Sequence, residues 1–167
     1  MIDLVKVLFR TTDGKPVFVD GDMHEQVSRW KWHVGLTGLV CRNGWKDGKR
    51  VWVFLHNLIL PPPPGLFTDH INRDPLDNRR LNLRFATRQQ NNWNRKKPKV
   101  GTSQFKGVSW YKSRELWVAK IKENGSQKTL GYFVDEKQAA MAYDREAVRI
   151  QGDFAVINLP DQLYARK

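Results

Sequence analysis

An aspartate directly followed by a histidine is the most chemically suggestive feature of this sequence. Asp69 and His70 lie in the segment TDHIN at residues 68–72, shortly after four consecutive prolines at 61–64. A histidine with a pKa near 6.5 can accept a proton at neutral pH. A carboxylate is an oxygen ligand of the kind that Mg²⁺ prefers. Side by side, the two groups could activate a water molecule and bind a cation at one phosphodiester.

Other polar residues surround this pair in the sequence. His56 precedes the prolines, Asn82 follows the pair, and Asn91 and Asn92 come later. An asparagine amide oxygen can add a second ligand, because Mg²⁺ often takes one or two protein groups and completes its shell with phosphate and water. A single histidine in a polar loop is usually exposed. Taken alone, Asn82 would be a turn residue, and Asn91 and Asn92 would be polar residues at the start of a helix. Their combination in one window favours a metal-dependent phosphodiesterase.

The charge distribution indicates a polyanionic partner. The chain has 167 residues and a formal net charge of +12. Residues 1–72 hold nine Lys/Arg and seven Asp/Glu (+2), residues 73–130 hold fifteen and four (+11), and residues 131–167 hold five and six (−1). A concentrated basic band is typical of nucleic-acid-binding proteins, whereas charge that serves solubility is spread over the surface. An acidic protein or a membrane surface is the alternative, but no basic amphipathic helix supports the membrane.

Composition excludes several other classes of protein. There is no run of eighteen apolar residues, and the N-terminal stretch MIDLVKVLFR contains Asp3 and Lys6, so we expect neither a membrane helix nor a signal peptide. The only cysteine, Cys41, excludes an internal disulfide and a multi-cysteine zinc site. We therefore expect a soluble protein of a reducing compartment, the cytoplasm.

Local patterns predict an α+β fold that begins with a β-rich segment over residues 1–55. The runs VKVLF, PVFV and RVWVFL are separated by DGK, DGD and KDGK turns, which is typical of short strands. MHEQVSRW predicts one or two helical turns. We expect the four tryptophans of this segment to build the core of its sheet: Trp30, Trp32, Trp45 and Trp52.

Residues 56–97 predict a strand, a loop, a second strand at 83–87 and a helix. Thr87 with Gln90 three positions later is a capping-box pattern, which places Asn91 in the first turn of that helix. The basic stretch around Pro98 and Gly101 predicts a linker, assigned to 98–103.

Residues 104–160 predict three antiparallel strands and one helix. In LWVAKIK, Trp117, Ala119 and Ile121 alternate with Val118, Lys120 and Lys122, as in a strand with two different faces. Asp135 and Gln138 predict the start of the helix and Gly152 its end. Its small residues, such as Ala139 and Ala140, would let the helix lie close on the sheet.

The segment LHNLIL, the proline link and DHINRDPLDNRRLNLRFATRQQNN together resemble the HNH endonucleases of phages and homing elements, over about residues 50–97. The resemblance implies a ββα-metal motif in residues 56–97. It implies that His70 is the general base, Asp69 and Asn91 are metal ligands, and Asn82 orients the histidine loop. Asn92 is the alternative second ligand. His56 matches a histidine common in this subgroup, whose role is catalytic, structural or phosphate-contacting.

The segments FKGVSW, LWVAKI, TLGYF, AYD and NLP resemble the AP2/ERF-type DNA-binding domain, over about residues 104–160. The resemblance implies a three-stranded antiparallel sheet that enters the major groove, with the helix behind it. By position it points to eight DNA contacts: Lys106, Ser109, Tyr111, Arg114, Lys120, Lys122, Lys128 and Thr129. Several of these positions hold Ser, Tyr or Thr where the plant domains have arginine, so the base preference is not inherited. A solvated charged sheet face is the alternative for any single lysine.

Seven basic residues of the nuclease segment are expected to contact phosphates without reading sequence: Arg79, Arg80, Arg84, Arg88, Arg95, Lys96 and Lys97. The sequence thus predicts a site-directed endonuclease that binds double-stranded DNA as a monomer and uses Mg²⁺, with Mn²⁺ as a substitute. A phage-encoded homing enzyme in a bacterial host is the first expectation. The alternatives are a general phage nuclease of loose specificity and a DNA-binding transcriptional regulator with an inactive HNH segment.

Overall fold

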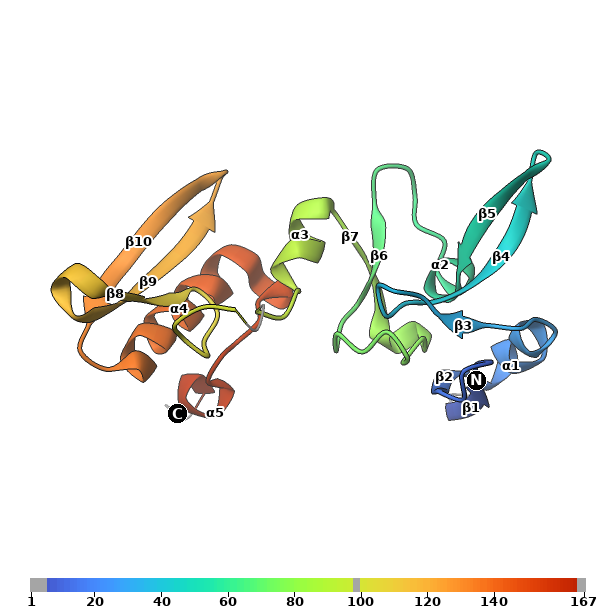
Figure 1. The fold of residues 1–167 in the computed structure, drawn as a ribbon, viewed down its shortest axis with the longest axis horizontal. Coiled ribbons are helices and arrows are strands. Elements are labelled where there is room, and N and C mark those ends of the chain that lie inside the picture. Colours follow the sequence, from blue (N-terminus) through green and yellow to red (C-terminus); the bar gives the residue numbers. More distant parts are fainter. Residues whose placement is uncertain (1–5, 98–99, 165–167) are drawn as a thin grey trace. The chain divides into compact units, whose positions relative to one another are not determined.

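The computed structural model of the protein describes residues 6–97 and 100–164, drawn in Figure 1. Residues 1–5 and two residues of the predicted linker, 98 and 99, lie outside this range. The chain divides into two compact units, residues 1–89 and 90–167. The predicted mixture of helices and small antiparallel sheets is confirmed.

Over residues 6–89, the first unit contains three small sheets and two helices. Strands β1 (Lys6–Arg10) and β2 (Pro16–Asp20) form a hairpin that leads into α1 (Gly21–Ser28). A three-stranded sheet follows, with the order β3 (His33–Val34), β4 (Val40–Lys46), β5 (Lys49–Phe54), and then α2 (Leu55–Ile59). The third sheet pairs β6 (Phe67–His70) with β7 (Leu83–Ala86), and the 3-10 turn η1 (Arg80–Asn82) lies just before β7.

One hydrophobic core joins the predicted N-terminal segment to the predicted nuclease segment. Val17 and Val19 alternate along β2 and are fully buried, and they belong to the same cluster as Leu55 of α2 and Leu83 of β7. Trp32 is 1% exposed, and its indole N–H donates to the backbone oxygen of Val27 at 2.9 Å. The β-rich segment is therefore part of the body that carries the Asp69–His70 pair.

The expectation that four tryptophans form the core is wrong for three of them. Trp30, Trp45 and Trp52 are 52%, 77% and 59% exposed. Trp45 lies at the outer end of the β4–β5 hairpin, where residues 45–50 are exposed throughout, and Trp52 lies on the same face of β5. Trp30 follows α1 outside the hairpin, with the Arg42 guanidinium 4.0 Å from the centre of its ring. Asp47 and Gly48 form the turn of the hairpin with φ of 50° and 71°, the two positive values that a tight two-residue hairpin loop requires.

The second unit holds one antiparallel sheet of order β10-β9-β8 with a long helix on one face. Helix α3 (Arg88–Trp93) crosses the division between the units. After it come β8 (Val108–Tyr111), the 3-10 turn η2 (Lys112–Arg114), β9 (Leu116–Glu123), β10 (Ser126–Phe133), α4 (Glu136–Gln151), the 3-10 turn η3 (Gly152–Phe154) and α5 (Pro160–Tyr164). Among the described residues, no helix combines the length and apolar character that crossing a membrane requires.

Helix α4 begins and ends where the sequence predicts. The Asp135 carboxylate accepts a hydrogen bond from the Gln138 backbone N–H at 2.8 Å, and Gly152 follows the helix with a φ of 53°. Ala139 and Ala140 are fully buried against Ala119 of β9, which confirms the close packing of helix on sheet. Val118 is buried as well, although its side chain is on the other side of β9.

Candidate active site

The Asp69–His70 pair forms the last two residues of β6, which places both side chains at the start of a loop. Antiparallel pairing with β7 sets Asp69 opposite Arg84 and His70 opposite Leu83. Asp69 is 6% exposed and His70 is 7% exposed, so neither is a solvated loop residue. Arg84 Nε lies 3.0 Å from Asp69 Oδ2, which gives the buried carboxylate a cationic partner.

Helix α2 brings His56 next to His70. The Thr68 hydroxyl donates to the Leu60 backbone oxygen at 2.7 Å and so ties β6 to the end of this helix. The His56 and His70 ring centroids are 5.2 Å apart with an interplanar angle of 70°, and Phe54 stacks on His56 at 5.7 Å.

Burial decides the charge state of His56. Desolvation, with a smaller contribution from nearby His70, lowers the His56 pKa to about 4, so its ring is neutral at pH 7. Its Nδ1 is buried and has no hydrogen-bond partner within the described part of the chain. A buried nitrogen with a lone pair or a proton to offer is a group that a ligand could satisfy.

Asn78 fixes the orientation of the His70 ring, and sequence reasoning missed it. Its side chain is fully buried, and its Oδ1 lies 3.2 Å from His70 Nε2. Asn78 Nδ2 donates to the Pro75 backbone oxygen at 2.9 Å, which settles that the amide oxygen faces the imidazole. Because that oxygen only accepts, Nε2 carries the proton and Nδ1 carries the lone pair. The geometry therefore selects the tautomer whose Nδ1 is the basic atom.

Burial also lowers the pKa of His70. The hydrogen bond to Asn78 and the nearby carboxylates of Asp69, Asp74 and Asp77 act in the opposite direction and limit the decrease. The ring is therefore neutral at pH 7 and able to accept a proton. The same carboxylates favour the imidazolium that proton transfer would create.

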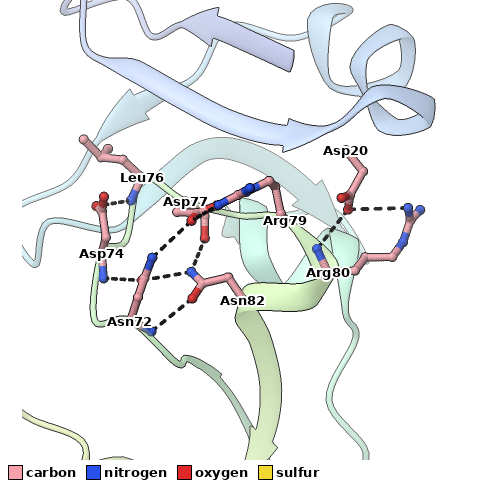
Figure 2. Close-up of polar contacts among 8 residues, drawn as sticks. All are labelled: Asp20, Asn72, Asp74, Leu76, Asp77, Arg79, Arg80 and Asn82. Carbon is pink, nitrogen blue, oxygen red and sulfur yellow. Dashed lines mark hydrogen bonds and ion pairs between the residues drawn. The ribbon is translucent and has the colours of Figure 1, made fainter. Parts of the chain in front are cut away.

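The loop between β6 and β7 is closed by reciprocal amide contacts, which Figure 2 shows. Asn82 Oδ1 accepts from the Asn72 backbone N–H at 3.0 Å, and Asn82 Nδ2 donates to Asn72 Oδ1 at 2.9 Å and to the Asp77 backbone oxygen at 2.7 Å. Arg79 forms two bonds with the Asp77 carboxylate, at 2.6 and 2.7 Å. Asn82 thus holds the ends of the loop together, whereas Asn78, inside the loop, contacts the His70 ring.

Strand β2 holds the outer side of the same loop. The Phe18 backbone N–H donates to the Leu76 oxygen, and the Asn78 N–H donates to the Phe18 oxygen, both at 2.8 Å. The buried Asp20 carboxylate accepts from the Arg80 backbone N–H at 2.8 Å, as drawn in Figure 2. The N-terminal hairpin therefore positions Asn78, and through it His70.

Several of the predicted phosphate contacts have carboxylate partners inside the protein. Arg79 pairs with Asp77, Arg80 with Asp22 and Asp20, and Arg84 with Asp69. Arg88, Arg95 and Lys96 are exposed, and Lys97 donates to the Ser103 backbone oxygen. The role of all seven in DNA binding remains a prediction.

The strand register shows which of the eight predicted DNA contacts of the second unit lie on the same face of the sheet. Five of the eight lie on the face of β8–β9–β10 that is turned away from α4: Ser109, Tyr111, Lys120, Lys122 and Thr129. Arg114 lies over the ring of Tyr132 at 5.0 Å on that face. Lys128 instead pairs with Glu146 of α4 at 2.8 Å, and Lys106 donates to the backbone oxygens of Trp93 and Arg95. The DNA contacts themselves stay a prediction.

Comparison with known proteins identifies the family. The family described as HNH endonuclease matches residues 61–93. An uncharacterized HNH endonuclease of Acanthamoeba polyphaga mimivirus is 33% identical over 151 residues, which make up 89% of this chain and 77% of that protein. The chain belongs to the HNH endonuclease family.

Two other relatives match parts of this HNH protein. Protein 3.8 of Escherichia phage T7 is 45% identical over 67 residues, which cover 40% of this chain and 55% of that protein. An AP2-like ethylene-responsive transcription factor of Arabidopsis thaliana is 41% identical over 64 residues, 38% of this chain and 13% of the plant protein. The chain thus spans about half of the phage relative and a small part of the plant protein. No solved structure shows significant similarity.

HNH endonucleases generally use a divalent metal ion, and the residues at the end of β6 fit one. Asp69 supplies carboxylate oxygens beside two neutral imidazoles. No group of three His, Cys, Asp or Glu side chains suited to a metal occurs in the described part of the chain. A site with one or two protein oxygens suits Mg²⁺, which completes its shell with phosphate and water. Asn91 is half-buried on α3 and Asn92 is exposed, and a ligand role for either remains a prediction.

Proposed function

We propose that this protein is a metal-dependent DNA endonuclease in which His70 is the general base. The observation that carries the proposal is the bond between His70 Nε2 and Asn78 Oδ1, which leaves Nδ1 of a neutral imidazole as the basic atom. Membership of the HNH endonuclease family supports phosphodiester hydrolysis as the reaction. The basic band over residues 73–130 supports DNA as the substrate.

In the proposed reaction His70 Nδ1 takes a proton from a water molecule as its oxygen attacks phosphorus. The new oxygen–phosphorus bond forms while the bond from phosphorus to the leaving sugar oxygen breaks. Asn78 Oδ1 keeps its hydrogen bond to Nε2 throughout, so the ring does not rotate as it becomes charged. The carboxylates of Asp74 and Asp77 stabilise the resulting imidazolium.

Asp69 would hold the metal ion, with Asn91 as the proposed second ligand. When bound, the ion supplies a Lewis acid that neutralises charge on the phosphate. Arg84 keeps the Asp69 carboxylate in place through its 3.0 Å contact. His56 packs against the edge of the His70 ring, and its buried Nδ1 is suited to a hydrogen bond with phosphate or water.

The second unit is proposed to hold the DNA through the open face of its sheet. Its order of three antiparallel strands followed by one helix, and the partial similarity to plant AP2-like factors, support this role. Lys120 and Lys122 give that face its positive charge. The combination of nuclease and binding unit favours cleavage at chosen sites, as in a homing enzyme, over general degradation.

The proposal is tested by digestion of a long double-stranded DNA with Mg²⁺ or Mn²⁺, followed by mapping of the ends on both strands. We expect cleavage that EDTA stops and excess Mg²⁺ restores. A small number of recurrent sites would support the homing role, whereas scattered cuts would support a general nuclease. Binding without any cleavage in either metal would refute the proposed activity and favour the DNA-binding regulator.

A further inference from the structure

The β4–β5 hairpin carries an unusual concentration of positive charge within the first unit. Residues 40–54 hold four cations, Arg42, Lys46, Lys49 and Arg50, and one carboxylate, Asp47, for a net charge of +3. The rest of residues 1–72 holds five Lys/Arg and six Asp/Glu, a net of −1. Residues 73–89 add five Lys/Arg and two Asp/Glu, so the first unit outside the hairpin carries a net charge of +2 over 74 residues, whereas the hairpin carries +3 over fifteen.

Two tryptophans share one face of this hairpin. The register pairs Trp45 with Arg50 and Asn43 with Trp52, so these four side chains point to the same side. Trp45 is 77% exposed and Trp52 is 59% exposed. Exposure of an indole ring to water is unfavourable, and an exposed cluster of large apolar side chains marks an interaction site. Arg50 Nε bonds to Asn43 Oδ1 at 3.1 Å, which holds these polar side chains beside the rings.

The tryptophan face leads directly to the candidate active site. Phe54 lies on the same face as Trp52, two residues further along β5, and its ring stacks on His56 at 5.7 Å. His56 in turn contacts His70. Figure 1 shows β4 and β5 as a long ribbon whose turn points away from α2. From Phe54 to Arg50 a strand extends about 13 Å, which equals about four base steps of DNA.

We infer that this hairpin face is a DNA-contacting surface that acts beside the scissile phosphate, separate from the sheet of the second unit. The inference rests on the proposed function for the identity of the substrate. Arg50, on the tryptophan face, would contact a phosphate there, and bases would stack on Trp45 and Trp52. Lys46 and Lys49 pair with each other on the opposite face at the end of the hairpin, and they would contact phosphates from that side. Trp45 and Trp52 lie on one diagonal of this group of four side chains, and the bonded pair Asn43 and Arg50 lies on the other, so each indole would stack a base on its solvent-exposed side.

Stacking on an indole requires a base that has left its own duplex stack. The surface should therefore favour DNA that is unpaired or easily unpaired next to the cut. A ribbon that only followed the groove of an intact duplex would gain little from two exposed tryptophans, because each indole has a single N–H donor and cannot form the paired hydrogen bonds that read a base edge.

The test uses the full chain in EDTA, so that no cleavage occurs, and a fluorescein-labelled DNA duplex of mixed sequence as the probe. A second probe is the same duplex with a short run of mismatched pairs. The double variant Trp45→Ala/Trp52→Ala is expected to weaken binding of the mismatched probe by about 10-fold or more, given the usual contribution of base–aromatic stacking. The wild type should prefer the mismatched probe, and the double variant should lose that preference.

Three further variants separate stacking from charge and from folding. Trp45→Phe/Trp52→Phe should retain most of the affinity, because a phenyl ring still stacks. Lys46→Gln/Lys49→Gln should reduce the slope of log affinity against log salt by about 0.9 for each phosphate that the variant no longer neutralises, whereas the tryptophan variants leave the slope unchanged. Leu36→Ala, which removes an exposed side chain from the segment between β3 and β4, is the matched control and should bind as the wild type does.

Wild-type affinity of the double alanine variant for both probes would overturn the inference. So would a wild type that dimerises without DNA while the double variant stays monomeric, because the face would then join two copies of this chain. The failures of the two proposals are distinguishable. If the wild type binds through the hairpin but never cuts, the nuclease proposal fails alone. If it cuts DNA and the double variant binds normally, the hairpin inference fails alone.

Discussion

Replacement of Asn78 should impair catalysis through His70, although Asn78 contacts neither water nor metal in the proposed reaction. Asn78→Leu keeps a similar volume and removes the two side-chain bonds, to His70 Nε2 at 3.2 Å and to the Pro75 oxygen at 2.9 Å. A buried polar group left without its partner costs about 1–3 kcal/mol; the His70 side of the lost pair is buried, whereas the Pro75 oxygen is only part-buried, so the change should cost about 1–3 kcal/mol of folding stability or slightly more. That is a large part of a typical total of about 5–15 kcal/mol.

Asn78→Asp separates positioning from folding. The carboxylate still accepts the hydrogen bond from His70 Nε2, but its charge favours the imidazolium and raises the His70 pKa. A general base works in its neutral form, so the rate falls below its pKa. Raising that pKa therefore moves the acidic limb of the pH profile to higher pH. Asn78→Asp should show this displacement in the single-turnover cleavage rate.

Asn124→Asp is the matched control for this measurement. Asn124 lies in the exposed turn between β9 and β10, so Asn124→Asp makes the same chemical change at a position without contact to His70. Its pH profile should coincide with that of the wild type. An Asn78→Asp enzyme that folds, cuts DNA and keeps the wild-type acidic limb would refute the argument that Asn78 sets the protonation of the base.

Three other predictions concern the metal, the buried histidine and the division of the chain. Asp69→Asn should need more Mg²⁺ for half-maximal cleavage, and Asn91→Ala should share this defect; a silent Asn91→Ala with a defective Asn92→Ala would move the second ligand by one residue. His56 titrates near 6.5 when unfolded and about 4 when folded, so stability should fall by about 3 kcal/mol in total as pH decreases between these values. Urea unfolding at several pH values should show a smaller decrease of the free energy of unfolding for His56→Gln than for the wild type. An equal decrease would contradict the assignment of this pH dependence to His56. A fragment of residues 1–97 lacks Arg114, Lys120 and Lys122, so its salt slope of DNA binding should decrease by about 3 if each contacts one phosphate, and an unchanged slope would place recognition in the first unit.

The Asp69–His70 pair could be singled out from the sequence because its signal is local. Asp69 and His70 are adjacent, and their residue types alone indicate a base and an oxygen ligand. The ends of α4 were predictable for the same reason, since Asp135, Gln138 and Gly152 act on backbone groups within a few residues. Short-range patterns of this kind require no knowledge of tertiary contacts.

Asn78 was not predictable, because its role depends on a contact with a strand far away in the sequence. The Phe18 backbone oxygen accepts from the Asn78 N–H, and together with the Asn78 side-chain bond to Pro75 this pairing holds Asn78 beside His70. In the sequence DNRRLN, Asn78 and Asn82 are both plausible turn residues. This segment holds two asparagines, but nothing in the sequence says which of them contacts His70.

The tryptophans show the limit of composition as a guide to burial. Trp32 is buried because α1 and β2 surround it, whereas Trp45 and Trp52 extend from a hairpin end that has no covering layer. Both kinds occur in similar β-rich sequence. Lys128 is another example: it pairs with Ile121 on the face of the sheet that packs against α4, and its ammonium lies 2.8 Å from the Glu146 carboxylate.

The central claim is that His70 is the general base, and the most direct measurement compares wild type with His70→Ala. Single-turnover cleavage and DNA affinity are measured with the same substrate, with Mg²⁺ for cleavage and with EDTA for affinity. The cleavage rate should fall by about 10²–10⁴-fold, because general-base catalysis contributes that much, while the dissociation constant stays unchanged. Cleavage by His70→Ala at the wild-type rate would contradict the account.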